Sequence, residues 1–328
     1  MILRAPLCCA LTALLALLLL SVGCTINVDV FGKASDPLKE YVLEGSGSNK
    51  VLIIPIRGFL SESPREGLVS QRPGVVQTVS SILHKAAQDD SIKAVVLLVN
   101  SPGGTVTAAD IIYHELMRFR SDHDVLMVAC IMSVGASGGY YVSMAADTIV
   151  AHPTSIVGSV GTIFITPKVQ GLMDKLGVGA EVTKSGKLKD MGTPFRESTP
   201  EEQKLVQSMI DTLNSRFLEL VKKRRHVSES ALADIAQAGV YTASQAKRNG
   251  LIDTIGYMDD AIELATTKAN LDDDPKVIIY RRNKIHDDTY FNPSSSNANA
   301  SLIDLGTIGT AIGLETGLYH LWMPGSRP

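Results

Sequence analysis

Short apolar runs alternate with segments of helical periodicity through the first half of the chain. Four runs are apolar at nearly every position and predict buried strands, at 51–56, 94–99, 125–131 and 148–151. Helical spacing follows the first two of them, at 75–87 and 108–119. Strands that are apolar at every position are typical of a sheet covered on both faces. The alternation therefore predicts an α/β fold, built of βαβ units around a mainly parallel sheet.

The second half of the chain is predicted to be mainly helical. Residues 199–202 (Thr-Pro-Glu-Glu) combine a cap residue, a proline at the first helical position and a glutamate at the third. The basic residues 222–225 complement the dipole at the end of this helix. A shorter helix over 243–249 ends at Gly250. The periodic pattern fades beyond about residue 271, so 271–328 is expected to be a partly mobile tail.

The first 24 residues have the pattern of an export segment. Arg4 is followed by an apolar run over 5–22 and then by Gly23 and Cys24. Either the run is a cleaved signal and Cys24 is lipidated, or the run is long enough to remain as a membrane anchor. Both outcomes tether the rest of the chain to a membrane, outside the cytoplasm.

The polar residues 25–49 are rich in Gly and Ser and are expected to be a linker from the membrane. The main domain is then expected to span 50–270. At 328 residues and a net charge of −3, the chain gives no reason to expect a nucleic-acid partner.

The cysteines and histidines indicate neither a disulfide nor a metal site. Three of the four cysteines lie in the export segment, which leaves Cys130 without an intramolecular partner. Cys130 lies in an apolar run and is interpreted as a small buried hydrophobe. The seven histidines are scattered, with no Cys/His spacing typical of a metal site, and no other cofactor is indicated.

Ser137 is the strongest candidate for a nucleophile. It is the centre of Gly-Ala-Ser-Gly-Gly (135–139), between an apolar strand and a helix-like run at 140–146. A serine there is close to the free N–H groups of a helix N-terminus. The pentapeptide alone fits equally well a tight helix start in which the serine is only a cap.

A second glycine turn strengthens the catalytic interpretation. Pro102-Gly103-Gly104 also follows a predicted strand, and the carboxyl ends of parallel strands lie at one end of a sheet. Gly104 or Gly103, together with Gly138, could supply the two N–H donors that an acyl-transfer enzyme needs for its oxyanion.

The residues alone leave both histidines and lysines as candidate bases for Ser137. Gly-x-Ser-x-Gly also fits a nucleophile elbow, which requires a later Asp and His. None of the four later histidines has a suitable setting, at positions 152, 226, 286 and 320. Lys184, Lys187 and Lys189 are alternatives, because a desolvated lysine can be neutral and act as a base. Three lysines in six residues are also typical of a solvated loop.

Six short motifs follow one another along the chain. They are 100–104 (Asn-Ser-Pro-Gly-Gly), 136–141 (Ala-Ser-Gly-Gly-Tyr-Tyr), 146–151 (Ala-Asp-Thr-Ile-Val-Ala), 158–161 (Gly-Ser-Val-Gly), 184–190, and 241–253 with its Gly-Leu-Ile-Asp end. In this order they resemble the signal peptide peptidase A family, whose members are membrane-tethered serine–lysine peptidases with a fold related to Clp proteases and crotonases.

The resemblance implies a role for each matching residue. It implies that Ser137 is the nucleophile, that Lys189 is the general base and that Ser159 orients this lysine. It assigns the oxyanion positions to Gly104 and Gly138. It also implies a homo-oligomeric ring in which neighbouring subunits supply the serine and the lysine, so that the two residues lie far apart within one chain.

The function expected from the resemblance is that of a membrane-associated serine endopeptidase. It would cut apolar peptides, such as signal-peptide remnants, through an acyl-enzyme. The alternatives are a Clp-like membrane protease with other substrates, a non-catalytic peptide-binding scaffold of the same fold, and an acyl-CoA enzyme of the crotonase type. The intact set of Ser137, Lys189 and Ser159 favours a peptidase, since neither a non-catalytic scaffold nor an acyl-CoA enzyme requires it.

Overall fold

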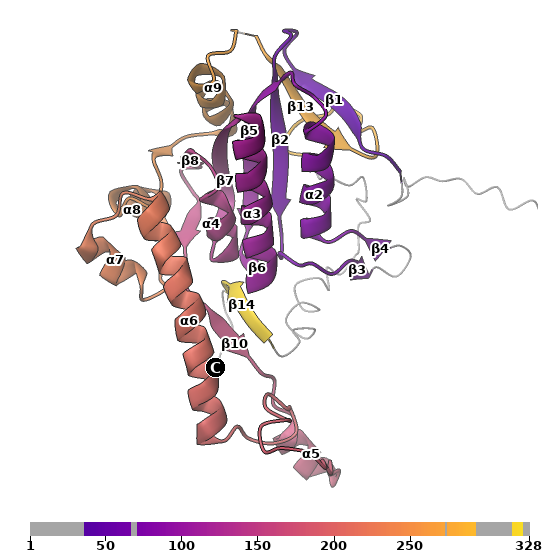
Figure 1. The fold of residues 1–328 in the computed structure, drawn as a ribbon, viewed down its shortest axis with the longest axis vertical. Helices are drawn as coiled ribbons and strands as arrows, with labels where there is room; N and C mark the ends of the chain where they lie inside the picture. Colours follow the sequence, from indigo (N-terminus) through magenta and orange to yellow (C-terminus); the bar gives the residue numbers. More distant parts are fainter. Residues whose placement is uncertain (1–35, 67–70, 273, 293–316, 324–328) are drawn as a thin grey trace, which may run out of the picture. The chain divides into compact units, whose positions relative to one another are not determined.

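The computed structural model describes residues 36–66, 71–272, 274–292 and 317–323 (Figure 1). The expected export segment with Cys24 lies outside the described residues, as do 293–316 of the expected tail. Across the described residues, no helix combines the length and the apolar character needed to cross a membrane.

A mainly parallel sheet forms the centre of the fold. Its principal strands run in the order β1-β13-β2-β5-β7-β8-β12, with bounds β1 (Lys39–Glu44), β2 (Lys50–Arg57), β5 (Ile92–Ser101), β7 (Leu126–Ala136), β8 (Thr148–Ala151), β12 (Thr254–Ile255) and β13 (Lys276–Arg281). Every neighbouring pair in this order is parallel except β1 with β13. The α/β class and the parallel sheet predicted from the apolar runs are confirmed.

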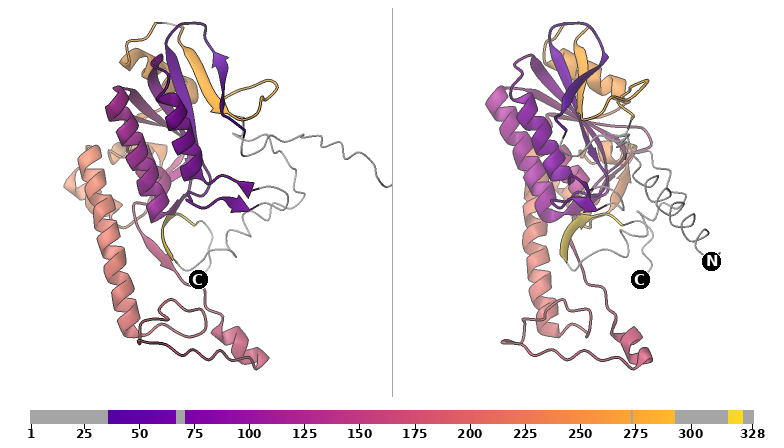
Figure 2. Two further views of the ribbon diagram at one scale, coloured as in Figure 1. Left: turned by 45° about the vertical axis from the view of Figure 1, so that its right-hand side comes forward. Right: turned by 90° about the vertical axis from the view of Figure 1, so that its right-hand side faces the viewer.

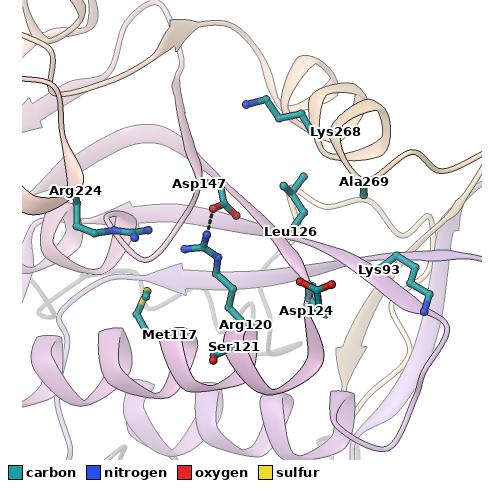
Figure 3. Close-up of a pocket in the computed structure, with 11 residues that line it drawn as sticks. Lys93, Met117, Arg120, Ser121, Asp124, Leu126, Asp147, Arg224, Lys268 and Ala269 are labelled. Carbon is teal, nitrogen blue, oxygen red and sulfur yellow. Dashed lines mark ion pairs between the residues drawn. The ribbon is translucent and has the colours of Figure 1, made fainter.

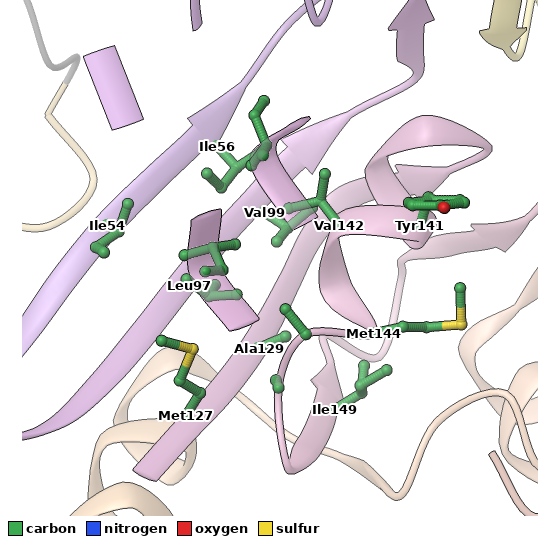
Figure 4. Close-up of a cluster of buried hydrophobic side chains, with 14 of the residues drawn as sticks. Ile54, Ile56, Leu97, Val99, Met127, Ala129, Tyr141, Val142, Met144 and Ile149 are labelled. Atoms are coloured by element: carbon green, nitrogen blue, oxygen red, sulfur yellow. The ribbon is translucent and has the colours of Figure 1, made fainter. Parts of the chain in front are cut away.

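The sheet is covered on both faces. One face carries α2 (Val75–Ala86), α3 (Val106–His123) and α4 (Gly138–Ser143), and the other carries α9 (Met258–Lys268). Along β2, Ile54 and Ile56 are buried under the first group of helices (Figure 4), and Val51 and Ile53 are buried with α9. Side chains alternate between faces along a strand, which explains why this strand is apolar throughout.

Besides α9, the described part of the second half contains four helices: α5 (Gln170–Leu176), α6 (Pro200–Arg224), α7 (Glu229–Ile235) and α8 (Ala243–Arg248). Thr199 begins α6 with the predicted capping box, in which its side chain and that of Glu202 each bond the other's backbone N–H. At the other end of α6, Arg224 donates to the carbonyls of Met144, Ala145 and Ala146. In both views of Figure 2, α6 runs from the region of α4 toward α5.

Two small sheets complete the fold. One is a pair, β3 (Arg65–Glu66) with β4 (Gln71–Arg72). The other has the order β10-β14-β6, with β6 (Gly103–Thr105), β10 (Ile163–Ile165) and β14 (Gly317–Leu321). At the carboxyl end of β7, β9 (Ile156–Gly158) pairs with β7 and also with β11 (Val240–Thr242).

Strands β1 and β13 lie in the stretches expected to be linker and tail. They complete the main sheet, because β13 pairs with both β2 and β1. Val277, Ile278 and Ile279 are at most 3% exposed, so this part of the tail is core. The sequence pattern missed β13 because its apolar run is short and no helical segment follows it. The domain limits drawn at 50 and 270 therefore do not bound the sheet.

We expect Ile278→Ala to lower the free energy of unfolding by about 2–5 kcal/mol, because it leaves a cavity beside β2. Val42→Ala on β1 is the control, since Val42 is 49% exposed and should change stability by less than about 1 kcal/mol. Urea unfolding followed by circular dichroism measures both. Equal, small changes would contradict a core position for β13.

Candidate active site

Ser137 lies where β7 ends and α4 begins. Its backbone has φ 52° and ψ −118°, and the residue is 1% exposed. The Ser137 N–H donates to the carbonyl of Gly158 at 2.7 Å, and the Ser137 carbonyl accepts from the N–H of Tyr141 at 2.9 Å. A positive φ in a residue with a Cβ costs about 1–3 kcal/mol and persists where the surroundings enforce it, which is often at active sites.

The glycine turn 102–104 lies directly against Ser137 and α4. A Cβ on Gly103 would lie only 2.8 Å from the Gly138 nitrogen, so the two turns meet at van der Waals distance. A Cβ on Gly104 would lie 2.0 Å from the carbonyl oxygen of Leu60. Only glycine allows these approaches. The fold therefore brings the two expected oxyanion glycines, Gly104 and Gly138, to the same end of the sheet as Ser137.

Ser159 lies on the loop that touches Ser137. Its N–H donates to the carbonyl of Gly239 at 2.7 Å, its φ is 51°, and it is 8% exposed. The residues on either side of this short loop bind Ser137: Gly158 accepts its N–H, and Gly161 accepts its hydroxyl at 3.5 Å. The loop that contains Ser159 is thus hydrogen-bonded to the candidate nucleophile on both sides of Ser159.

Lys189 does not lie beside Ser137 in the single chain. Its loop is joined to the first turn of α6, where Lys187 pairs with Glu201 at 2.7 Å. The α4 region instead contacts α6 at Phe217, whose ring is 5.0 Å from that of Tyr141. The sixteen residues from Glu201 to Phe217 span about 24 Å of helix. Within one chain, the serine and this lysine are therefore far apart.

The three candidate lysines have different partners. Lys184 pairs with Asp190 at 2.6 Å, and Lys187 pairs with Glu201. Lys189 is exposed, and across the described residues its amine forms no ion pair. Its loop presents this amine outward, where a second molecule could contact it.

Arg196 fixes the loop to α6. Its guanidinium binds Asp190 at 2.7 Å and Glu202 at 2.5 Å. The hydrogen bond from Arg196 lowers the pKa of Glu202 to about 2, and Arg196 with Lys184 holds the pKa of Asp190 well below its ordinary value. Since both pKa values are lowered, these contacts stabilise the loop above the ordinary carboxyl pKa and are lost only as the pH falls toward 2.

His320 is the residue that sequence reasoning missed. It lies on β14, is 2% exposed, and its Nδ1 is 2.9 Å from the carbonyl oxygen of Gly161. That same oxygen accepts the Ser137 hydroxyl, so the imidazole is close to the candidate nucleophile. Burial lowers the pKa of His320 to about 4, so the ring is neutral at pH 7. The short apolar run of residues 317–321 (Gly-Leu-Tyr-His-Leu) was the available sequence signal.

A pocket of about 720 Å³ lies elsewhere, at the other end of the sheet (Figure 3). It is lined by the beginnings of β5 and β7 at Lys93 and Leu126, and by Arg120, which pairs with Asp147. Sites in parallel sheets lie at the carboxyl ends of the strands, where Ser137 is. The pocket is therefore separate from the candidate active site.

The sequence matches two known peptidase families. The sequence matches peptidase family S49 over residues 121–272 and Clp protease over residues 71–157. A protein of Enterococcus faecium, provisionally named signal peptide peptidase SppA, is 32% identical over 74% of this chain and 71% of its own length. A protein of Methanocaldococcus jannaschii, provisionally named a protease, is 36% identical over 66% of this chain and 68% of its own.

Longer relatives match as well. Protease 4 of Haemophilus influenzae is 32% identical over 70% of this chain, which corresponds to 36% of its own length. Among solved structures, a membrane-bound stomatin-specific protease with a substrate peptide aligns with a TM-score of 0.40 at 14% identity, over 67% of this chain and 81% of that one.

These matches define the class as a serine-type peptidase with a Clp-like α/β fold. The chain belongs to peptidase family S49 and to its signal peptide peptidase branch.

We expect Arg196→Gln to release the loop that carries Lys189, because it removes the contacts to Asp190 and Glu202. Trypsin should then cut between residues 184 and 189 roughly fivefold faster at pH 7. Arg248→Gln is the matched control, since Arg248 is exposed on α8. Equal cutting rates in the two variants would show that Arg196 does not hold the loop.

Proposed function

We propose that this chain is a membrane-associated serine endopeptidase whose Ser137–Lys189 dyad is shared between neighbouring subunits. The observation that carries the proposal is Ser137 itself, held in a costly backbone conformation at the N-terminus of α4, with the glycine turn 102–104 directly against it. A serine that is only a helix cap would not need this conformation, because cap residues ordinarily have extended backbones.

Ser137 Oγ attacks the carbonyl carbon of the scissile bond while Lys189 Nζ accepts the hydroxyl proton. The N–H groups of Gly104 and Gly138 stabilise the oxyanion. Lys189 returns the proton to the leaving amine, which departs as the C–N bond breaks. A water molecule, deprotonated by the same lysine, then hydrolyses the acyl-enzyme and regenerates the serine.

The loop that carries Lys189 supports the proposal that the lysine acts on a neighbouring subunit. It belongs to a stretch, 163–205, with many large apolar side chains exposed: Ile163, Leu172, Leu176, Val178, Val182, Phe195 and Leu205 are 37–68% exposed. Such a density of exposed apolar residues is typical of a protein–protein contact. Burial in that contact would remove Lys189 from water, as a lysine that acts as a general base requires.

Ser159 is proposed to orient the incoming lysine. It lies between the two residues whose carbonyls bind Ser137, so a lysine that reaches the Ser137 hydroxyl also comes within reach of this side chain. A hydroxyl there can accept from the charged lysine and donate to the neutral one. Ser159 is a positioning residue in this mechanism.

The proposed substrates are extended apolar peptides such as signal-peptide remnants. Relatives named as signal peptide peptidases support this class. The alternative is a Clp-like membrane protease that takes other substrates.

We expect Ser137→Ala and Lys189→Ala each to lower kcat on a fluorogenic apolar peptide by at least about 10³-fold, because each removes one half of the dyad. Lys187→Ala is the control, since Lys187 is on the same loop but its side chain is 75% exposed and paired with Glu201. It should remain within about threefold of the unaltered protein.

Co-assembly of the two inactive variants tests the shared site. If one subunit supplies Ser137 and its neighbour supplies Lys189, random mixing restores an intact pair at about a quarter of the contacts. Co-expressed Ser137→Ala and Lys189→Ala chains should therefore regain about a quarter of the activity. An inactive mixture of assembled chains would confine the dyad to one chain, and an active Lys189→Ala variant would exclude Lys189 as the base.

The membrane tether is proposed to be lipidated Cys24. Cells fed a radiolabelled fatty acid should label the unaltered chain and the Cys9→Ser variant, and they should not label Cys24→Ser. A chain that sediments with membranes but takes up no label would instead indicate that the apolar run over 5–22 remains as the anchor.

A further inference from the structure

Ser101 is a fully buried polar residue that the proposed mechanism does not use. It is the last residue of β5 and is 0% exposed. Its hydroxyl donates to the carbonyl of Gly58 at 2.6 Å and accepts from the N–H of Gly103 at 3.1 Å. The Ser101 side chain therefore joins the segment after β2 to the glycine turn that contains Gly104.

Both partners of Ser101 have conformations that glycine adopts far more readily than other residues. The angle φ is 71° at Gly58 and 105° at Gly103. Because a glycine has no side chain to pack, hydrogen bonds and the close approach of neighbouring backbone must hold such a turn in one conformation. The hydroxyl of Ser101 supplies one of these hydrogen bonds at each glycine.

The peptide groups on both sides of Gly103 are held. On one side its N–H binds Ser101 Oγ, and on the other its carbonyl accepts from the N–H of Leu60 at 2.9 Å. That carbonyl belongs to the same trans peptide group as the N–H of Gly104, and the two bonds point in opposite directions. The two hydrogen bonds therefore set the direction of the Gly104 N–H, which an oxyanion donor needs to have fixed.

Ser101 also contacts the segments that hold the candidate nucleophile, Ser137. Its main chain lies so close to α4 that a Cβ on Gly139 would be 2.4 Å from the Ser101 carbonyl oxygen. Across the sheet, Ser101 pairs with Gly135, which is two residues before Ser137 on β7. One buried residue thus contacts the glycine turn, the start of α4 and the strand that leads to the nucleophile.

We propose that Ser101 is a positioning residue for the oxyanion. Its hydroxyl holds the glycine turn so that the N–H of Gly104 is aligned with that of Gly138 before the reaction begins. Donors that are fixed in advance need no rearrangement as the oxyanion forms, and this lowers the barrier to acylation. Ser101 acts through the turn, since its one hydroxyl proton is donated to Gly58. The catalytic consequence rests on the proposed function, whereas the holding of the turn does not.

A buried serine can instead serve only the stability of the core, as a hydroxyl that satisfies nearby backbone groups. Ser155 is such a serine and provides the matched control. It is 1% exposed, its hydroxyl bonds the carbonyl of Ile131 at 2.9 Å, and across the described residues it makes no hydrogen bond to either glycine turn. A purely structural role lowers stability, whereas a positioning role also lowers kcat with little change in KM.

The activity test uses full-length chains. Ser101→Ala should lower kcat on a fluorogenic apolar peptide about 10- to 100-fold and keep KM within about threefold, because the oxyanion donors act in the transition state. Ser155→Ala should destabilise the fold to a similar extent and keep kcat within about threefold. Ser101→Cys keeps nearly the same volume with weaker hydrogen bonds, so its kcat should be intermediate. Unchanged kcat in the folded Ser101 variants, or an equal loss in Ser155→Ala, would overturn the proposal.

An apolar peptide aldehyde gives a readout that a structural role would not move. Its carbonyl carbon bonds to Ser137 Oγ, the hydroxyl proton moves to Lys189, and the aldehyde oxygen takes the oxyanion position. The Ki of the aldehyde should rise in Ser101→Ala by about the factor lost from kcat. Adding Ser101→Ala to Ser137→Ala should leave the binding of the uncleaved peptide unchanged. Equal losses of peptide and aldehyde binding would show a structural role and overturn the proposal.

Hydrogen exchange tests the holding of the turn without catalysis. Resolved to single amides, exchange at Gly103 should be at least about tenfold faster in Ser101→Ala than in the unaltered protein or Ser155→Ala, because the Gly103 N–H has lost its acceptor. Equal exchange in the three proteins would overturn the proposal. If no chain cleaves a peptide or binds the aldehyde while this difference is seen, the proposed function fails and the role of Ser101 in the turn stands.

Discussion

Ser137 adopts a conformation that its own residue type disfavours, and the surrounding segments together enforce it. Its N–H binds the carbonyl of Gly158 at the end of β9, and its carbonyl begins the hydrogen-bonding of α4. The close approach of Gly103 to the Gly138 nitrogen leaves no room for a side chain at that turn. Because β7 pairs with both β5 and β9, the sheet fixes the positions of these three strands relative to one another. A shift of any strand would move the serine relative to the glycines that face it.

The candidate catalytic groups fall on two parts of the chain with different physical properties. Ser137, Gly104, Gly138 and Ser159 lie on or beside the rigid sheet and are buried. Lys189 lies on an exposed loop, held to α6 through Arg196 and two carboxylates. A charged, solvated lysine is a poor base, and it becomes a good one only when another surface excludes water from it. Assembly would then be a condition for activity, which would restrict proteolysis to the assembled enzyme.

The small sheet that contains β14 links the end of the chain to the active site. Its middle strand presents a main-chain carbonyl to the two glycines and a neutral ring to the pocket formed by Tyr141 and Phe217.

The sequence by itself determined the parallel sheet, the long capped helix and the two glycine turns, because local periodicity and cap chemistry specify these elements without distant contacts. It also singled out Ser137 as a candidate nucleophile. Only the tertiary structure decided that β13 joins β2 and that His320 lies beside Ser137. These depend on pairings between residues more than a hundred positions apart, for which short apolar segments such as β13 and β14 carry no partner information in their own sequences.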